Sequence, residues 1–230
     1  EIMPSLVGSE MCIRDRIERK ILASREEWLK HRSRIGGSDA AAIVGLNPYK
    51  TNTDLYLEKT GQKESPDISD KPYVLYGTKA EEHLRELFRL DFPQYQVQYF
   101  DNNMYLNSKY PFAHASLDGE LTDEDGRRGI LEIKTTNILQ SMQKEKWKDR
   151  IPDNYFIQVL HYLMVTEFDF VALKAQLKSE FGGQIYLQTK HYFIERSEVE
   201  GDIEYLAEEE AKFWKCVEAK KMPNLILPDI

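Results

Sequence analysis

Cysteine is scarce in this chain of 230 residues. The two cysteines, Cys12 and Cys216, show neither the paired spacing of a zinc site nor the regular spacing of a disulfide framework. Two isolated cysteines favour a reducing, cytoplasmic setting over a disulfide-stabilised extracellular one.

Long hydrophobic runs and an excess of basic residues are also missing. No apolar stretch approaches the roughly 20 residues that cross a bilayer, so the sequence predicts no membrane partner. The net charge of −8 argues against a protein that coats nucleic acid nonspecifically, because such affinity comes from Lys and Arg meeting phosphates. It does not exclude a nuclease, since metal-binding carboxylates and an acidic outer face can accompany a local basic channel.

The first residues look foreign to the rest of the chain. Leu6–Asp15 reads LVGSEMCIRD, which resembles the translation of a transposon-type sequencing adapter, and Arg16 follows. An ordinary disordered N-terminus is the other interpretation, whereas a signal peptide would need a basic start and a continuous apolar core. We therefore expect a non-native or disordered leader over 1–16. A single domain is expected over 17–230, since no repeat or linker divides that stretch and its length suffices for one sizeable core.

Hydrophobic periodicity predicts helices in the first part of the chain and a mixture of strands and helices in the second. A capping-box pattern at Ser24–Glu27 predicts an early helix, and Ser38 is predicted to cap a short helix over 40–44. Further helices are expected over 51–59, 73–90, 154–166 and 197–221. Strands are expected over 112–121, 130–135, 171–177 and 186–194, with a hairpin near 97–106. This order of elements predicts an α/β fold.

Two of the expected strands carry charged residues. Ser116-Leu117-Asp118-Gly119 is followed, after a short polar turn, by Leu131-Glu132-Ile133-Lys134. Adjacent strands would bring Asp118 and Glu132 together, and Glu132 and Lys134 share one face because side chains alternate along a strand. A salt bridge at a strand end is the simpler interpretation of Glu132 and Lys134 alone. Two carboxylates and an ammonium group on one sheet face favour a catalytic site.

Such a set of groups suits the hydrolysis of a phosphodiester. That reaction needs a hard metal ion to neutralise developing charge and to make water more acidic, and Mg²⁺ prefers oxygen ligands. Asp118, Glu132 and the backbone carbonyl of Ile133 could supply the protein's share. Lys134 could orient or help deprotonate the attacking water and stabilise the charged phosphorane. The sequence thus predicts a Mg²⁺ site, and we expect Mn²⁺ to substitute.

Two helical segments supply further candidates. Glu81 lies near the start of a predicted helix, close behind Gly77, and is either a solvated helix carboxylate or part of the site. Gln158 and Tyr162 are four residues apart and share one face of an otherwise apolar helix. A buried glutamine needs a hydrogen-bond partner, which is either the backbone of the core or a group in the site.

Together these segments resemble the YqaJ-like viral recombinase family, which includes the phage lambda exonuclease, within the PD-(D/E)xK nuclease superfamily. The resemblance extends from about Trp28 to Glu195 and rests on five landmarks that occur in the family's order. They are Trp28…Arg32 with Ile35-Gly36-Gly37-Ser38-Asp39, Gly77…Glu81, Asp118-Gly119, Glu132-Ile133-Lys134 and Gln158…Tyr162. Leu117 is a departure, because some relatives have proline before the aspartate.

The resemblance implies a restriction-endonuclease-like core, with a mixed central β-sheet flanked by helices. It implies that Asp118 and Glu132 bind metal, that Lys134 assists the nucleophile, and that Glu81 and Gln158 complete the active site.

A second implied site holds the 5′-terminal phosphate of the strand being digested. Arg32 and Ser38 occupy the matching positions, with Arg34 and Tyr162 as possible support. Whether Arg32 or Arg34 holds the phosphate stays open, because the spacing to Ser38 is shifted by one residue.

The resemblance also implies the activity, which is 5′-to-3′ digestion of linear duplex DNA to leave 3′ single-stranded tails. Its expected partners are double-stranded DNA ends, two further copies in a homotrimer, and a single-strand annealing protein of phage-type recombination in a bacterial host. Two alternatives stay open. One is a structure-specific or helicase-associated endonuclease of the same superfamily, although iron–sulfur cysteines and a helicase segment are absent. The other is a DNA-end-binding module without catalysis, which would have no reason to keep two facing carboxylates.

Overall fold

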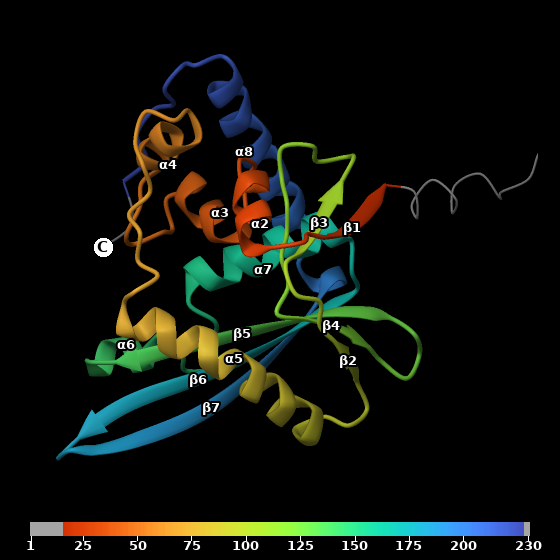
Figure 1. Ribbon diagram of the computed structural model, residues 1–230, viewed down its shortest axis with the longest axis vertical. Coiled ribbons are helices and arrows are strands. Elements are labelled where there is room, and N and C mark those ends of the chain that lie inside the picture. The colour runs from red at the N-terminus through yellow and green to blue at the C-terminus, as the bar shows by residue number, and fades with distance from the viewer. Residues whose placement is uncertain (1–15, 228–230) are drawn as a thin grey trace, which may run out of the picture.

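The computed structural model describes residues 16–227, so all of the predicted leader except Arg16 lies outside the described residues. Helices and strands alternate along the chain (Figure 1). In order they are β1 (Ile17–Ile21), α2 (Arg25–His31), α3 (Gly37–Ile43), α4 (Asn52–Lys59), α5 (Pro72–Asp91), β2 (Gln96–Gln98), β3 (Asn103–Asn107), β4 (Gly119–Thr122), β5 (Arg128–Ile138), α6 (Ser141–Glu145), α7 (Asp153–Thr166), β6 (Phe170–Phe181), β7 (Gln184–Glu195), the 3₁₀ turn η1 (Arg196–Glu198) and α8 (Glu200–Glu218).

The central sheet is mixed, as the resemblance to the YqaJ-like family implies. Its five strands lie in the order β2-β4-β5-β6-β7, and only the β5–β6 pair is parallel. A parallel pair needs a long crossover connection, which α6 and α7 supply between β5 and β6. The shorter strands β1 and β3 form a separate antiparallel pair.

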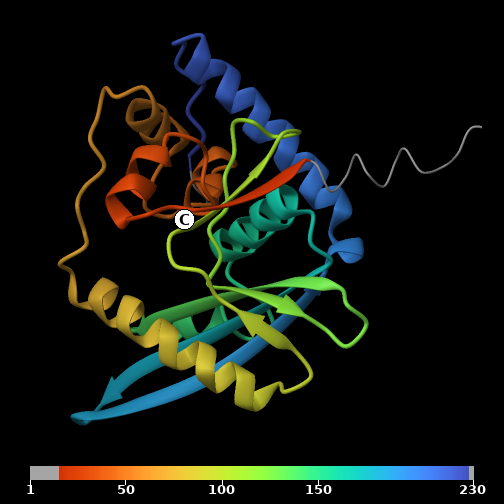
Figure 2. The same ribbon diagram turned by 45° about the vertical axis from the view of Figure 1, so that its right-hand side comes forward.

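Helices cover both faces of the sheet (Figures 1 and 2). On one face α5 packs Leu84 and Phe88 against Leu131 and Ile133 of β5. On the other face lies α7, which is buried on every side from Ile157 to Thr166 because α3 and α8 cover its outer surface. No helix between residues 16 and 227 has both the length and the apolar composition needed to cross a lipid bilayer.

Two helix starts test the predicted caps. The Ser24 hydroxyl accepts a hydrogen bond from the Glu27 amide at 3.1 Å, which confirms the first cap. The cap predicted at Ser38 is wrong, because α3 begins at Gly37 and has Gly36 as its N-cap. There the Asp39 carboxylate accepts a hydrogen bond from the Gly36 amide at 3.1 Å. Ser38 therefore lies within the first turn of the helix.

The predicted hairpin over 97–106 is wrong. Its two arms are strands, but β2 pairs with β4 in the central sheet whereas β3 pairs with β1 outside it. The strand predicted over 112–121 is regular only from Gly119 onward. Before that point the Asn103 amide group holds the Leu117 backbone through bonds of 2.8 and 2.9 Å. A side chain thus replaces the strand ladder just ahead of Asp118.

Candidate active site

Two carboxylates meet where the β4–β5 ladder ends. Gly119 pairs with Leu131, so Asp118 lies just before β4, and Glu132 follows the last residue of β5 that pairs with β4. One carboxylate oxygen of Asp118 accepts a hydrogen bond from the Ile133 amide at 2.8 Å. The side chain of Asp118 therefore bridges the two strands at the point where their backbone pairing stops.

Glu132 is almost completely buried, at 1% exposure, and its two oxygens have different surroundings. Oε1 lies 2.5 Å from the Lys134 ammonium and accepts a hydrogen bond from the Gln158 amide at 3.1 Å. The same Gln158 nitrogen donates to the Tyr162 hydroxyl at 2.7 Å. The other oxygen, Oε2, is buried without any hydrogen-bond partner. The structure thus brings Asp118, Glu132, Lys134 and Gln158 together.

Glu81 approaches the same place from α5. Its carboxylate accepts a hydrogen bond from Arg85 at 2.7 Å, one helical turn further along. Arg85 is itself buried, donates to the Asp118 backbone carbonyl at 2.6 Å, and stacks on the Tyr99 ring at 3.6 Å. The sequence does not predict Arg85 as a site residue, and its spacing of four from Glu81 is the one sequence signal that could have indicated it.

The electrostatics of the site reflect an excess of negative charge. Burial, reinforced by the charge of Asp118, raises the pKa of Glu132 to about 8. Burial and Asp118 likewise raise the pKa of Glu81 to about 7, and burial raises the pKa of Asp118. For Lys134, burial works against the charged form, but Glu132 and Asp118 outweigh it and raise the pKa above the ordinary lysine value. The positive charges of Lys134 and Arg85 therefore do not fully compensate the three carboxylates of Glu81, Asp118 and Glu132.

A hard metal ion fits this deficit. The unpartnered Glu132 oxygen next to Asp118 gives two carboxylate oxygens that could bind a cation, and oxygen ligands suit Mg²⁺. Among residues 16–227 no three His, Cys, Asp or Glu side chains enclose a common metal position. Mg²⁺ usually keeps several waters and takes one or two carboxylates, so a small protein donor set is sufficient.

The residues proposed for a terminal phosphate lie on the helical side of the same site. Arg32 donates to the Ser38 hydroxyl at 3.3 Å, whereas Arg34 donates to the Pro111 carbonyl at 2.8 Å. A side chain at Gly37 would come within 2.5 Å of the Tyr162 ring, so only glycine lets α3 approach α7 this closely. Arg32 and Ser38 are thereby held beside Tyr162, and Arg34 contacts a different segment.

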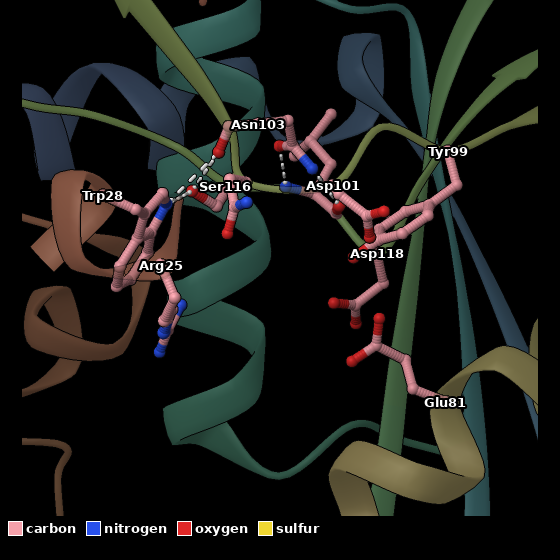
Figure 3. A pocket seen from close by; sticks show the side chains of 10 residues that line it. Arg25, Trp28, Glu81, Tyr99, Asp101, Asn103, Ser116 and Asp118 are labelled. Atoms are coloured by element: carbon pink, nitrogen blue, oxygen red, sulfur yellow. Dashed lines mark hydrogen bonds between the residues drawn. The ribbon is translucent and has the colours of Figure 1, made fainter. Parts of the chain in front are cut away.

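A pocket of about 310 Å³ opens in front of the carboxylates. Figure 3 shows Arg25 and Trp28 of α2 on one side of it, and Glu81 and Asp118 on the other. The Trp28 indole donates to the Ser116 hydroxyl at 2.9 Å, and the Arg25 guanidinium stacks on the indole at 3.9 Å. Trp28 is one of the family landmarks and Ser116 lies two residues before Asp118, but the sequence indicates no role for either side chain and gives no signal for Arg25.

The central sheet is mixed, has helices on both faces, and holds Asp118, Glu132 and Lys134 at the point where the β4–β5 pairing ends. This is the restriction-endonuclease-like fold. Residues 27–169 match the YqaJ-like viral recombinase domain, and the chain belongs to this family.

Similarity to known proteins supports both the family and the fold. The chain is 33% identical over 193 residues to the uncharacterized protein YqaJ of Bacillus subtilis (strain 168), and the match covers 83% of this chain. It covers 56% of that relative, so the chain spans little more than half the relative's length.

Two solved structures have the same fold. One is an alkaline exonuclease from Laribacter hongkongensis, with a TM-score of 0.59, 18% identity, and coverage of 85% of this chain and 93% of the other. The second is a phage-related exonuclease from Haemophilus somnus 129PT, with a TM-score of 0.55, 13% identity, and coverage of 81% and 96%.

Proposed function

We propose that this protein is a metal-dependent DNA exonuclease that digests linear duplex DNA from 5′ to 3′. The observation that carries the proposal is the buried Glu132, which has one oxygen held by Lys134 and Gln158 and the other unpartnered beside Asp118. The exonucleases with the same fold and the YqaJ-like domain support DNA as the substrate. The Laribacter enzyme has also been solved in complex with dAMP, a deoxynucleoside monophosphate of the kind that stepwise digestion of DNA releases.

Asp118, Glu132 and the backbone carbonyl of Ile133 would hold the metal ion. The N–H and C=O groups of one strand residue point to the same side, and the Ile133 amide faces Asp118. Its carbonyl therefore faces the same gap beyond the end of β4. A bound Mg²⁺ or Mn²⁺ would neutralise charge on the phosphate and lower the pKa of water.

The chain's own side chains would perform the remaining tasks. Lys134 would orient the attacking water and stabilise the charge that develops on the phosphorus oxygens, because its ammonium is fixed against Glu132. Gln158 holds Glu132 in place, and Tyr162 holds Gln158. Glu81 lies on the opposite wall from α7 and would add a further oxygen donor.

Arg32 and Ser38 are proposed to bind the 5′-terminal phosphate. Their mutual contact at 3.3 Å and their position beside Tyr162 favour Arg32 over Arg34, whose guanidinium is engaged by Pro111. By the same family analogy, we propose a homotrimer that works with a single-strand annealing protein in phage-type recombination in the cytoplasm of a bacterial host.

Linear duplex DNA labelled separately at each 5′ and 3′ end tests the proposal, with Mg²⁺ or EDTA and with a covalently closed circle alongside. The expected result is metal-dependent loss of the 5′ label while the circle stays intact. Cutting of the circle would replace the proposal with an endonuclease. Full cleavage in excess EDTA would refute the metal mechanism.

Asp118→Ala separates an enzyme from a module that only binds DNA ends. An exonuclease should lose cleavage and keep DNA binding. A binding module should bind DNA ends as well as the wild-type protein does. Absence of cleavage by the wild-type protein on every substrate would favour the binding module.

A further inference from the structure

A cluster of positive charge lies beyond the end of β5 in a chain whose net charge is −8. Lys146, Lys148 and Arg150 line a depression of about 450 Å³ together with Met142 and Glu145, and we call this surface the basic depression. Its cations are exposed. Lys148 has one exposed partner, Glu145 at 3.5 Å, whereas Lys146 and Arg150 have no carboxylate within salt-bridge distance in residues 16–227. Asp149 follows Lys148 in the sequence but does not line the depression, whose lining has three cations against the one carboxylate of Glu145.

The backbone that carries these cations is fixed by a buried tryptophan. Trp147, between Lys146 and Lys148, is 3% exposed and packs on the Tyr155 ring at 5.5 Å. Its carbonyl accepts hydrogen bonds from Lys190 at 2.6 Å and from Tyr192 at 2.5 Å, both on β7. A mobile loop would lose conformational entropy on binding a ligand, whereas this segment is already held in place.

The same contacts connect the basic depression to the active site. The Lys134 ammonium lies 5.2 Å from the centre of the Tyr155 ring on which Trp147 packs. Along the chain, β5 runs from Lys134 to Ile138 and leads directly into α6 (Figure 1). Trp147 stands between Lys146 and Lys148, so its packing on Tyr155 places the depression next to the active site.

We propose that the basic depression binds the phosphate backbone of the duplex DNA whose end lies at the active site. This inference rests on the proposed nuclease function, and it locates the positive surface that an acidic DNA-binding protein requires. The contact is with phosphates rather than bases, because three exposed cations on one short segment supply charge without a base-reading geometry. It should therefore contribute affinity and salt dependence without sequence preference.

The test compares two triple variants of equal charge. Lys146→Gln/Lys148→Gln/Arg150→Gln removes the cations of the depression, and Lys212→Gln/Lys215→Gln/Lys221→Gln removes three exposed lysines in and just beyond the last turns of α8. Binding of a fluorescently labelled duplex is measured by anisotropy in EDTA between 50 and 200 mM salt. All six side chains are exposed, and thermal melting checks that both variants remain folded.

We expect the first variant to bind at least about tenfold more weakly, with a salt slope reduced by about 2 to 3, since each phosphate contact contributes about 0.9. The α8 variant should keep the wild-type affinity and slope. Unchanged binding by the first variant, or equal weakening of both, would overturn the inference. The result is independent of cleavage, so a wild-type protein that binds through the depression but cleaves no DNA would refute the nuclease proposal alone.

Discussion

Two regions of the molecule bury carboxylates, and they balance the negative charge differently. Over the sheet, Glu81, Asp118 and Glu132 surround Lys134, and we call this the acidic cluster. Among the helices, Asp39 pairs with Lys59 at 2.7 Å and His161 pairs with Glu210 at 2.7 Å, and we call this the paired cluster. In the first region burial and mutual repulsion raise carboxylate pKa values, whereas in the second each carboxylate has its own basic partner.

The two aspartates show the contrast most directly. Burial alone would raise the pKa of Asp39, but Lys59 and the Gly36 amide outweigh it and lower that pKa. Burial raises the pKa of Asp118, although Lys134 and the Ile133 amide oppose the change. An unpartnered oxygen by itself does not distinguish the regions, because Glu210 Oε2 is buried and unpartnered too. The surplus of carboxylates makes the acidic cluster a place for a cation.

The largest expected effect is on catalysis at the acidic cluster. Glu132→Gln keeps the shape of the side chain but removes the charge that would bind the metal ion. Because metal stabilisation of the transition state is worth several kcal/mol, we expect the digestion rate of linear duplex DNA to fall at least about 10³-fold. Glu82 follows Glu81 in the sequence but is exposed, so it provides the control, and Glu82→Gln should leave the rate unchanged. A Glu132→Gln rate within tenfold of wild type would contradict the assignment.

The second effect is on stability and has opposite consequences for the two aspartates. Asp39→Asn leaves the Lys59 ammonium buried without its partner, so we expect a loss of about 3–5 kcal/mol in the free energy of unfolding. Asp118→Asn removes a repelling charge and keeps an oxygen for the Ile133 amide, so the metal-free protein should be as stable or more stable. Urea unfolding in EDTA at pH 8 measures both. Equal destabilisation by the two substitutions would remove the distinction between the clusters.

A third effect arises at Gly37, where the two regions touch. Alanine at this position would place a carbon 2.5 Å from the Tyr162 ring and push α3 away from α7. Overpacking of this kind costs about 1–3 kcal/mol, and it should also raise the KM for DNA because Ser38 moves with α3 and its contact with Arg32 is disturbed. Gly201, in α8, has open space around it, and Gly201→Ala should stabilise the protein by about 0.4–1 kcal/mol. A Gly37→Ala protein with wild-type stability and KM would show that this close approach is dispensable.

The smallest effect concerns pH and the paired cluster. Burial would lower the pKa of His161, but the Glu210 carboxylate and the His114 carbonyl outweigh it and raise that pKa. A raised histidine pKa stabilises the fold fully below the ordinary value near 6.5 and loses this effect as pH rises through the folded-state value.

Urea midpoints should therefore decrease with pH above about 7.5 in the wild-type protein, whereas below that pH the buried His114, whose pKa burial lowers to about 3, acts with the opposite sign. The raised carboxylate pKa values of the acidic cluster contribute with the same sign, so the measurement needs saturating Mg²⁺ to suppress their share. Under those conditions His161→Gln should flatten the profile. A decrease as steep in His161→Gln as in wild type would contradict the role of the ion pair.

The sequence predicted the acidic cluster because its signal is local. Glu132 and Lys134 are two apart on a strand, and Gln158 and Tyr162 are four apart on a helix, so each pair shares a face whatever the rest of the fold does. Asn103 and Trp28 also contribute to the geometry, but their partners are distant in sequence, and Arg85 has only its spacing from Glu81 as a local signal. Nothing near Asn103 indicates that its amide will hold Leu117 and end a predicted strand early.

The same limit explains the error in the sheet. Alternating apolar residues correctly located β2 and β3, but periodicity carries no information on which strand a segment pairs with. Short connections usually join neighbouring strands, and this prior favoured a hairpin. In the structure β3 pairs with β1, and its Met104 packs with Leu22 and Trp28 near α2. The predicted mixed α/β architecture survives because it depends on the order of elements more than on each pairing.

The hydrogen bond from the Ile133 amide to Asp118 makes this amide a spectroscopic probe of the site. An amide proton donated to a carboxylate has a resonance that shifts with the charge of that carboxylate. In a ¹⁵N-labelled sample, the Ile133 cross-peak should therefore move when Asp118 is titrated, when Mg²⁺ is added, or when Asp118→Asn replaces the anion. One nucleus in the backbone of β5 would thus report the state of the site before any DNA is present.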